Sequence, residues 1–231
     1  MFRIHKPIRS LLQNSNAVRG MSCKGNVEYL RPEWQLADLN ATMESYAISI
    51  TYRAASLDRP VTAIRIFAAA GEPSRGWLTV DGQIVPVALG RGGIKANKRE
   101  GDGGTPKGTF RPRRLWWRAD RHPRPRTFLP VRAIGPEDAW CEDPNSRHYN
   151  QPVRLDRARS GDRLRRDDHL YDFIVEIDHN SSPRIAGRGS AVFLHLAREN
   201  FSPTAGCVSM TKAAMLRLLA RLSPKTRIVI G

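Results

Sequence analysis

The dipeptide Asp81-Gly82 separates two runs of strand-forming residues, 77–80 and 83–89. Both central positions of a two-residue type I′ turn need a positive φ, which Asp and Gly tolerate better than most residues. The sequence therefore predicts an antiparallel hairpin over 77–89. Pro86 lacks a backbone N–H, so one side of the second strand is expected to be an exposed edge.

The other patterned segments predict several strands and one helix. Runs rich in β-branched and aromatic residues lie at 61–67, 127–134, 170–178, 190–196 and 226–230. The alternation at 170–178 predicts a strand with one polar face. Thr211 is a candidate N-cap, and an apolar i, i+3, i+4, i+7 pattern follows at Met215, Leu218, Leu219 and Leu222. We therefore expect a mainly β domain at 60–231 with one C-terminal helix after Cys207, preceded by a poorly ordered extension at 1–59.

The charge balance is strongly basic, with 38 Lys and Arg against 22 Asp and Glu and a formal net charge of +16. Such a chain favours contact with polyanions, namely nucleic acid, anionic lipid head groups or cell-wall polymers. One hypothesis is therefore a nucleic-acid-binding module, in which the arginines of 111–126 and the rings of Trp116, Trp117 and Phe128 form a stacking and phosphate-binding surface. That stretch contains no recognisable nucleic-acid motif.

Several other kinds of site are disfavoured. Cys23, Cys141 and Cys207 are too few and too widely spaced for a disulfide framework or a zinc knuckle. The glycine-rich loop at 90–108 lacks the Gly-Lys-Ser/Thr ending of a phosphate-binding loop. No apolar run reaches the roughly eighteen residues of a membrane-spanning helix, so none is expected.

His195 ends the apolar run 190–195, and Cys207 follows Gly206 twelve positions later. A cysteine attacks a carbonyl as its thiolate and therefore needs a base, which His195 supplies if its strand ends beside the Cys207 loop. Gly206 lets the backbone approach a substrate without a Cβ in the way, and the amides of Gly206 and Cys207 are candidate donors to an oxyanion. On the residues alone, the alternative is that Cys207 is a small buried hydrophobe and His195 a satisfied core residue.

Three ordered motifs give the chain a resemblance to a known family. They are Phe193-Leu194-His195, the stretch PTAGCV at 203–208 and the stretch GDGGTPKGTF at 101–110, and they are accompanied by WCEDP at 140–144 and Tyr149-Asn150. Together they resemble the L,D-transpeptidase catalytic domain of the YkuD family over about residues 61–231. The resemblance implies a β-sandwich or barrel-like fold with Cys207 as nucleophile and His195 as general base. It also implies that the Leu196 carbonyl orients the imidazole, that Gly206 contributes to the oxyanion site, and that no metal or organic cofactor takes part.

The reaction that this resemblance implies is attack on the bond before the terminal D-Ala of a peptidoglycan tetrapeptide stem. D-Ala leaves, a thioester forms on the enzyme, and an amine resolves it, giving a 3→3 cross-link or an exchanged D-amino acid. An L,D-carboxypeptidase, with water as the acceptor, is the nearest alternative. Two positions depart from the family pattern, because Ala205 and Ser209 stand where many members have His and Arg. We expect these two departures to affect substrate binding.

The resemblance also implies a location in the periplasm or cell envelope. Peptidoglycan stem peptides are then the expected partners, and anionic cell-wall polymers are a further expected contact of the basic surface. No signal peptide is visible in the first residues, since 8–18 is interrupted by polar side chains. A cytoplasmic location, another export route and a true start at Met21 or Met43 therefore stay open.

Overall fold

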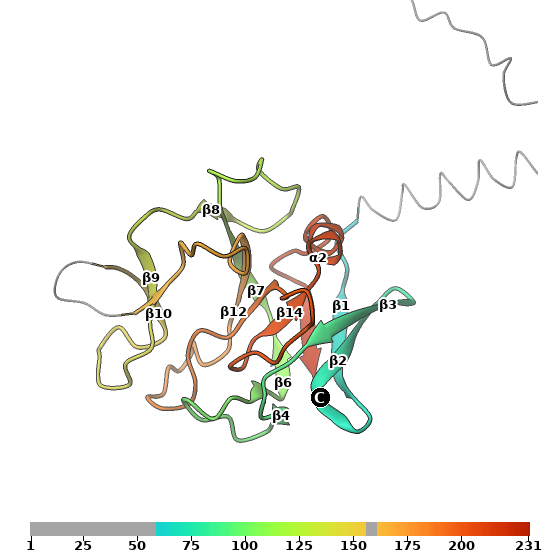
Figure 1. The fold of residues 1–231 in the computed structure, drawn as a ribbon, viewed down its shortest axis with the longest axis horizontal. Helices are drawn as coiled ribbons and strands as arrows, with labels where there is room; N and C mark the ends of the chain where they lie inside the picture. The colour runs from blue at the N-terminus through green and yellow to red at the C-terminus, as the bar shows by residue number, and fades with distance from the viewer. Residues whose placement is uncertain (1–58, 156–160) are drawn as a thin grey trace, which may run out of the picture. The chain divides into compact units, whose positions relative to one another are not determined.

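The computed structural model describes residues 59–155 and 161–231. The extension predicted at 1–59, with Met21, Cys23 and Met43, therefore lies outside the described residues except for its last residue. Strands predominate in the described part (Figure 1). Ten of them form one sheet, in the order β6 (Gly108–Phe110), β15 (Arg227–Ile230), β1 (Ala63–Ala69), β2 (Glu72–Val80), β3 (Gln83–Ala88), β14 (Val208–Met210), β13 (Phe193–Leu196), β12 (Phe173–Ile177), β7 (Pro112–Trp117) and β8 (Val131–Ala133).

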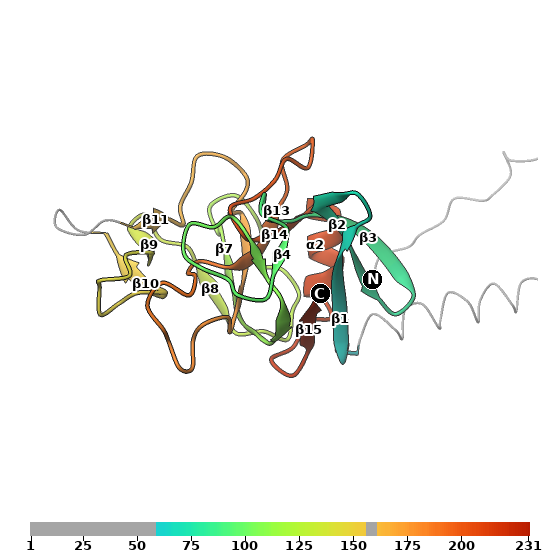
Figure 2. The same cartoon turned by 90° about the horizontal axis from the view of Figure 1, so that it is seen from below.

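Two smaller sheets complete the strand arrangement. One has the order β10 (Gln151–Arg154), β9 (Asp138–Cys141) and β11 (Asp162–Arg163), and the other pairs β4 (Ile94–Lys95) with β5 (Thr105–Pro106). The β9–β11 sheet and the β1–β3 strands lie at opposite ends of the domain (Figure 2). The predicted mainly β fold is therefore confirmed.

The hairpin predicted at Asp81-Gly82 joins β2 to β3. The φ angles of these two residues are +45° and +75°, and Val80 pairs with Gln83 across the turn. Positive φ at both central positions is what a type I′ turn requires. On its other side β3 pairs with β14 only at Ala88, so most of that edge, including Pro86, has no second neighbouring strand.

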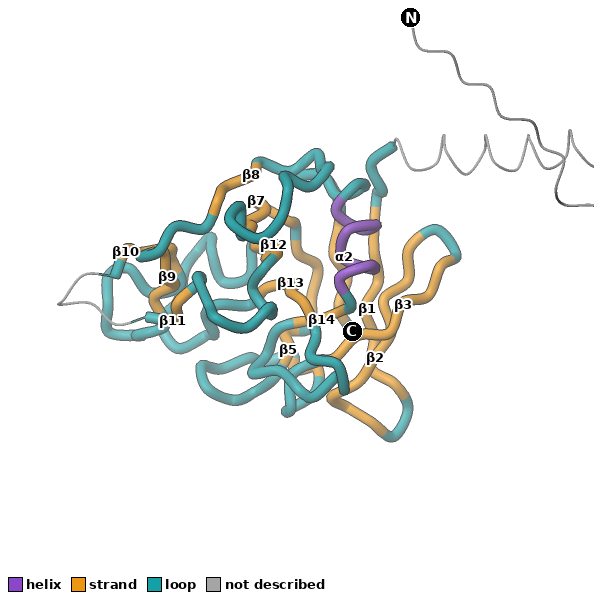
Figure 3. The backbone as a smooth tube through the Cα atoms, turned by 45° about the horizontal axis from the view of Figure 1, so that its top comes forward, coloured by secondary structure: helices purple, strands orange, loops and turns teal. Residues whose placement is uncertain are grey.

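The described residues contain one helix, α2 (Lys212–Leu219), which begins at the predicted cap. The Thr211 hydroxyl accepts a hydrogen bond from the Ala214 amide at 3.3 Å, which satisfies one free donor of the first turn. The helix runs beside the β1–β2 part of the sheet (Figure 3). Its buried side chains share one hydrophobic cluster with β1 and β13, through Met215, Leu218, Leu219, Ile64, Ile66, Leu194 and Leu196. No described helix is both long and apolar enough to cross a bilayer.

A second hydrophobic cluster lies on the opposite face of β13, because neighbouring side chains of a strand point to opposite faces. Leu194 and Leu196 belong to the α2 cluster, whereas Phe193 belongs to the second one. This second cluster also contains Cys207, together with Trp116, Ile134, Trp140, Leu164, Ile174 and Ala191. The predicted nucleophile thus lies where the large sheet meets the β9–β11 region.

The strand predictions for 170–178, 127–134 and the segment of β7 need correction. Glu176, one of the polar side chains expected on one face of the first segment, is buried, as are the other residues of β12. In the sheet β12 is paired on both edges, by β13 and β7, and its two faces pack into the two hydrophobic clusters. The Glu176 carboxylate is accommodated by Trp116 Nε1, at 3.0 Å, and by Arg114 Nε, also at 3.0 Å. The arginine-rich segment that forms β7 was not predicted as a strand, and of 127–134 only Val131–Ala133 is one.

Candidate active site

The predicted nucleophile and base come from two neighbouring parallel strands. Leu194 of β13 pairs with Val208 of β14, and His195 pairs with Ser209. Cys207 immediately precedes Val208, the first residue of β14, so it lies beside Phe193 of β13. Phe193 is two residues before His195 in the same strand. Because side chains alternate, Cys207 and His195 project to the same face of the sheet. The fold therefore brings together two residues that lie twelve positions apart.

The Cys207 thiol is buried, with 7% of the residue exposed. Its Sγ donates to the Ala191 carbonyl at 3.2 Å and accepts from the Phe193 amide at 3.4 Å. Burial raises the pKa of Cys207 to about 12, against an opposing effect of the Phe193 hydrogen bond, and the Asp162 and Glu142 charges add to the rise. At pH 7 the resting sulfur is therefore a neutral thiol.

The imidazole of His195 is oriented by a backbone carbonyl. Its Nδ1 lies 2.8 Å from the Leu196 oxygen. A carbonyl only accepts, so Nδ1 carries the proton and Nε2 keeps its lone pair. Burial lowers the pKa of His195 to about 4, despite the favourable Leu196 hydrogen bond. The ring also packs edge-on against Tyr171, with centroids 5.4 Å apart. His195 is thus neutral, and its unprotonated Nε2 has no hydrogen-bond partner among the described residues.

No hydrogen bond joins His195 to Cys207 among the described residues, because each is bonded to a carbonyl of its own neighbourhood. The resting site is therefore a pair of neutral groups rather than a thiolate–imidazolium ion pair. Rotation of the thiol away from Ala191 is needed before Nε2 can take its proton. Such a pair can act by general-base catalysis, in which the proton moves as the sulfur attacks.

The turn before Cys207 is fixed by Thr204. The Thr204 hydroxyl donates to the Cys207 carbonyl at 2.7 Å and accepts from the Gly206 amide at 3.1 Å. The expectation that both the Gly206 and Cys207 amides are available to an oxyanion is therefore wrong for the Gly206 amide. The Cys207 N–H has no acceptor among the described residues. It is the backbone donor that remains free at the site.

Gly206 meets two requirements of this turn. Its φ of +149° lies in a region that residues with a Cβ rarely adopt. A Cβ at this position would also lie 2.9 Å from the Gly104 carbonyl oxygen. Gly104 belongs to the glycine-rich segment at 101–110, so that segment packs directly against the nucleophile turn. Thr105 strengthens the contact, because its hydroxyl accepts from the Gly90 amide at 2.8 Å and lies 3.5 Å from the Cys207 carbonyl.

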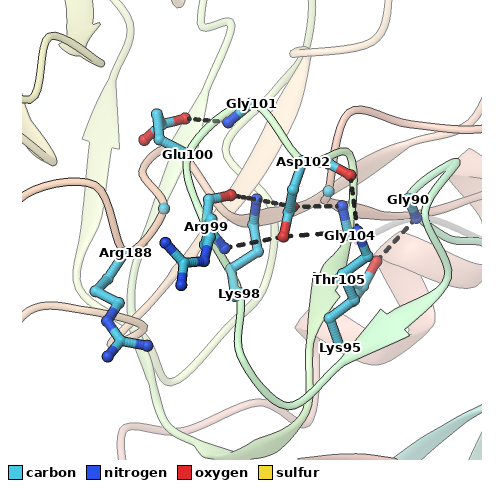
Figure 4. Close-up of polar contacts among 12 residues, drawn as sticks. Gly90, Lys95, Lys98, Arg99, Glu100, Gly101, Asp102, Gly104, Thr105 and Arg188 are labelled. Atoms are coloured by element: carbon cyan, nitrogen blue, oxygen red, sulfur yellow. Dashed lines mark hydrogen bonds and ion pairs between the residues drawn. The ribbon is translucent and has the colours of Figure 1, made fainter.

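The glycine-rich segment is organised around one carboxylate (Figure 4). Asp102 accepts hydrogen bonds from the Arg99 amide at 2.9 Å, the Gly104 amide at 2.8 Å and the Lys98 ammonium at 2.7 Å. Burial alone would raise the pKa of Asp102, but these three donors outweigh it and hold the pKa far below its usual range. Asp102 is therefore a fixed negative charge that holds Lys98.

Two acidic groups also influence the Cys207 thiol. The Tyr171 hydroxyl donates to Asp162 at 2.8 Å, and burial raises the pKa of Asp162. Glu142 is exposed overall, yet partial desolvation of its carboxyl, with the nearby Asp162 and Glu100 charges, raises its pKa to about 7. Both Asp162 and Glu142 act on the Cys207 thiol. The charged groups that act on the thiol thus include two acids, Asp162 and Glu142, and one cation, Lys98.

Sequence reasoning gave no individual role to Lys98, Asp102, Thr204 or Tyr171, although Asp102 and Thr204 lie within the motifs that carry the family resemblance. Tyr171, just before β12, comes beside His195 because β12 pairs with β13. The two positions that depart from the family pattern also differ in placement. Ala205 is exposed, whereas Ser209 is 2% exposed and stands opposite both His195 and Ala88.

The residues of the nucleic-acid hypothesis are largely engaged within the protein. Trp116 is fully buried and donates to Glu176, so its ring is not available for stacking on a base. Arg118 pairs with Asp120 at 2.8 Å, and Arg121 pairs with Asp172 at 2.9 Å. Phe128, at 44% exposure, is the one ring of the three that is exposed.

Comparison with known proteins adds one finding. The family model for the L,D-transpeptidase catalytic domain, YkuD, matches residues 65–230, well over half of the chain. No curated protein and no solved structure gives a significant match. The matched span contains every described residue of the site. Within the described residues no three His, Cys, Asp or Glu side chains are placed to hold a metal ion.

Proposed function

The chain belongs to the L,D-transpeptidase catalytic domain family, and on that premise we propose that it is a cysteine acyltransferase acting on peptidoglycan stem peptides through a thioester on Cys207. The observation that carries the proposal is the common face shared by Cys207 and His195 on adjacent parallel strands. A hydrogen bond to Leu196 holds His195 in the tautomer that a base needs.

In the proposed first half-reaction the thiol proton moves to His195 Nε2 as the sulfur attacks the carbonyl carbon before the terminal D-Ala. The carbonyl oxygen becomes an oxyanion that accepts a hydrogen bond from the Cys207 amide. The C–N bond then breaks, and the imidazolium returns its proton to the departing D-Ala amine. A thioester on Cys207 and a neutral His195 remain.

The second half-reaction reverses these roles. An acceptor amine attacks the thioester carbonyl while Nε2 takes one of its protons, and the Cys207 sulfur leaves and regains that proton. A diaminopimelate side-chain amine as acceptor yields a 3→3 cross-link, and a free D-amino acid yields an exchanged stem. Gly206 supports these steps because, without a side chain, it lets the substrate approach the backbone. Leu196 supports them because its carbonyl orients the imidazole of His195.

Water in place of the amine would make the protein an L,D-carboxypeptidase with the same site. Incubation with purified tetrapeptide stems, followed by mass analysis of products, separates the two activities. Cross-linked dimers support the transpeptidase proposal, whereas tripeptides alone indicate the carboxypeptidase. Cys207→Ala should abolish both products, while Cys141→Ala, at the other described free cysteine, should abolish neither. Products that persist in Cys207→Ala would refute the assigned nucleophile.

We also propose that the protein acts in the periplasm or cell envelope, because its proposed substrate is the peptidoglycan stem. The net charge of +16 would favour contact with anionic cell-wall polymers. Binding to isolated sacculi that weakens as salt rises would support this contact, since salt screens exposed charges. Binding that does not change between low and high salt would contradict it.

A further inference from the structure

We propose that the Lys98 ammonium, held by Asp102, is the second hydrogen-bond donor of the oxyanion site, beside the Cys207 amide. This inference deepens the proposed acyl transfer and rests on it. It gives a catalytic role to a buried cation in the glycine-rich loop, and it explains why that loop packs against the nucleophile turn.

The site lacks a second backbone donor. Stabilisation of a tetrahedral oxyanion uses preorganised donors that point to where the negative charge develops. The Gly206 amide is bonded to the Thr204 hydroxyl at 3.1 Å, so only the Cys207 amide is free in the turn. An oxyanion bound there has one backbone donor and needs a further group, and a cation is the strongest hydrogen-bond partner for an anion.

The position of Lys98 in the fold, buried beside the Cys207 turn, suits this role. Only 6% of its surface is exposed. Its Cε would be 3.6 Å from a Cβ at Gly206 and 3.1 Å from a Cβ at Gly189. The Lys98 stem therefore lies in tight contact with the Gly189 position and in van der Waals reach of the Gly206 position. Because Gly206 immediately precedes Cys207, the stem lies beside the turn that carries the Cys207 amide.

The ammonium has one donor to spare. Lys98 Nζ donates to the Arg99 carbonyl at 2.7 Å and to Asp102 Oδ1 at 2.7 Å. An ammonium has three N–H bonds, and the third has no acceptor among the described residues. Asp102 is itself fixed by the Arg99 and Gly104 amides, as Figure 4 shows. The ammonium is thus held in one position before any substrate binds, which is what preorganisation requires.

Charge at the site also favours this role. The groups that face Cys207 from other elements include Asp162 and Glu142, both acidic. Their charges would disfavour an oxyanion as they disfavour a thiolate. Lys98 is the positive group that acts on the thiol in the opposite direction. A cation on this side allows negative charge to develop on sulfur and oxygen in turn.

The test compares two reactions of Cys207. A carbapenem acylates a cysteine through a tetrahedral oxyanion, whereas iodoacetamide alkylates it by direct displacement with no oxyanion. Lys98→Met keeps the length of the stem and removes the charge. Loss of one oxyanion donor should lower the acylation rate about 10²- to 10³-fold. We expect the alkylation rate to fall by much less, because alkylation depends only on the thiolate.

Lys95→Met is the matched control. Lys95 is in the same loop, donates to the Asp102 backbone carbonyl at 3.2 Å and lies 3.8 Å from its carboxylate, yet it is more exposed and is not part of the proposed oxyanion site. We expect it to acylate at the wild-type rate. If Lys98→Met leaves an unpaired buried carboxylate and fails to fold, the double variant Lys98→Met/Asp102→Asn removes both charges and retains one carbonyl oxygen as acceptor for one of the two backbone amides.

The outcomes separate this inference from the proposed function. A wild-type protein that is not acylated would refute the acyl transfer itself. A wild-type protein that is acylated, with Lys98→Met or the double variant equally fast, would overturn the role of Lys98 alone. An equal loss of acylation and alkylation would also overturn it, since that pattern indicates an effect on the thiol rather than on the oxyanion.

Discussion

Replacing Gly206 by alanine should weaken the fold and impair the site by amounts that the geometry allows us to estimate. The φ of +149° costs a residue with a Cβ about 1–3 kcal/mol. The new Cβ would also lie 2.9 Å from the Gly104 oxygen, a backbone atom that cannot turn aside, and overpacking of this kind costs about 1–3 kcal/mol. The sum is about 2–6 kcal/mol. For a domain of this size that lowers Tm by roughly 5–20 °C.

Gly71→Ala is the matched control for this variant. Gly71 has a φ of +78° in the turn between β1 and β2, and a Cβ there would meet nothing within 4 Å. Its alanine variant bears the backbone strain without the clash and lies outside the site, so its Tm should fall less and its acylation rate should not change. Thermal unfolding followed by circular dichroism and the rate of carbapenem acylation are the assays. Equal Tm values for the two variants, with equal acylation rates, would refute the close approach of Gly104 to the nucleophile turn.

Three further predictions follow from the same contacts. Thr204→Val should lower the free energy of unfolding by about 1–3 kcal/mol, because it removes the hydroxyl that bonds both the Gly206 amide and the Cys207 carbonyl. Thr204→Ser keeps a hydroxyl and should restore most of this free energy. If denaturant unfolding shows no change for Thr204→Val, these hydrogen bonds contribute nothing to stability. The rate of Cys207 alkylation by iodoacetamide should rise about tenfold per pH unit from pH 7 to 10 with no plateau, because the pKa of the thiol is about 12. A plateau of this rate near neutral pH would instead indicate a thiolate that is already formed. The pKa of His195 is lowered from 6.5 to about 4, so its contribution to stability is present above pH 6.5 and is lost as pH falls toward 4. Across this window the free energy of unfolding should fall more steeply with pH for the wild type than for His195→Gln. Identical slopes of unfolding free energy against pH would contradict the buried neutral imidazole.

Local signals in the sequence predicted local structure well. Asp81-Gly82 predicts the hairpin because the turn conformation is a property of those two residues, and Thr211 predicts the start of α2 because a cap bonds within its own turn. The Cys207 and His195 pair was found because its motifs lie close together in sequence. These features depend on short-range geometry, which spacing alone expresses.

Features that depend on the packing of distant segments were missed. β7 is rich in arginine, and its burial depends on Glu176 of β12, whose carboxylate accepts from Trp116 and pairs with Arg114. Lys98 is charged and lies in a glycine-rich loop, so nothing in its neighbourhood predicts that it is buried beside Gly206. The engagement of the Gly206 amide by Thr204 is likewise a matter of side-chain orientation, which residue order does not express.

The central claim is that Cys207 forms an acyl-enzyme with His195 as its base. Intact-mass spectrometry after incubation with a carbapenem tests it most directly, on the wild type, Cys207→Ala and Cys141→Ala. We predict one covalent adduct per chain in the wild type and in Cys141→Ala, and none in Cys207→Ala. A folded wild-type protein without an adduct, or an adduct that persists in Cys207→Ala, would contradict the account.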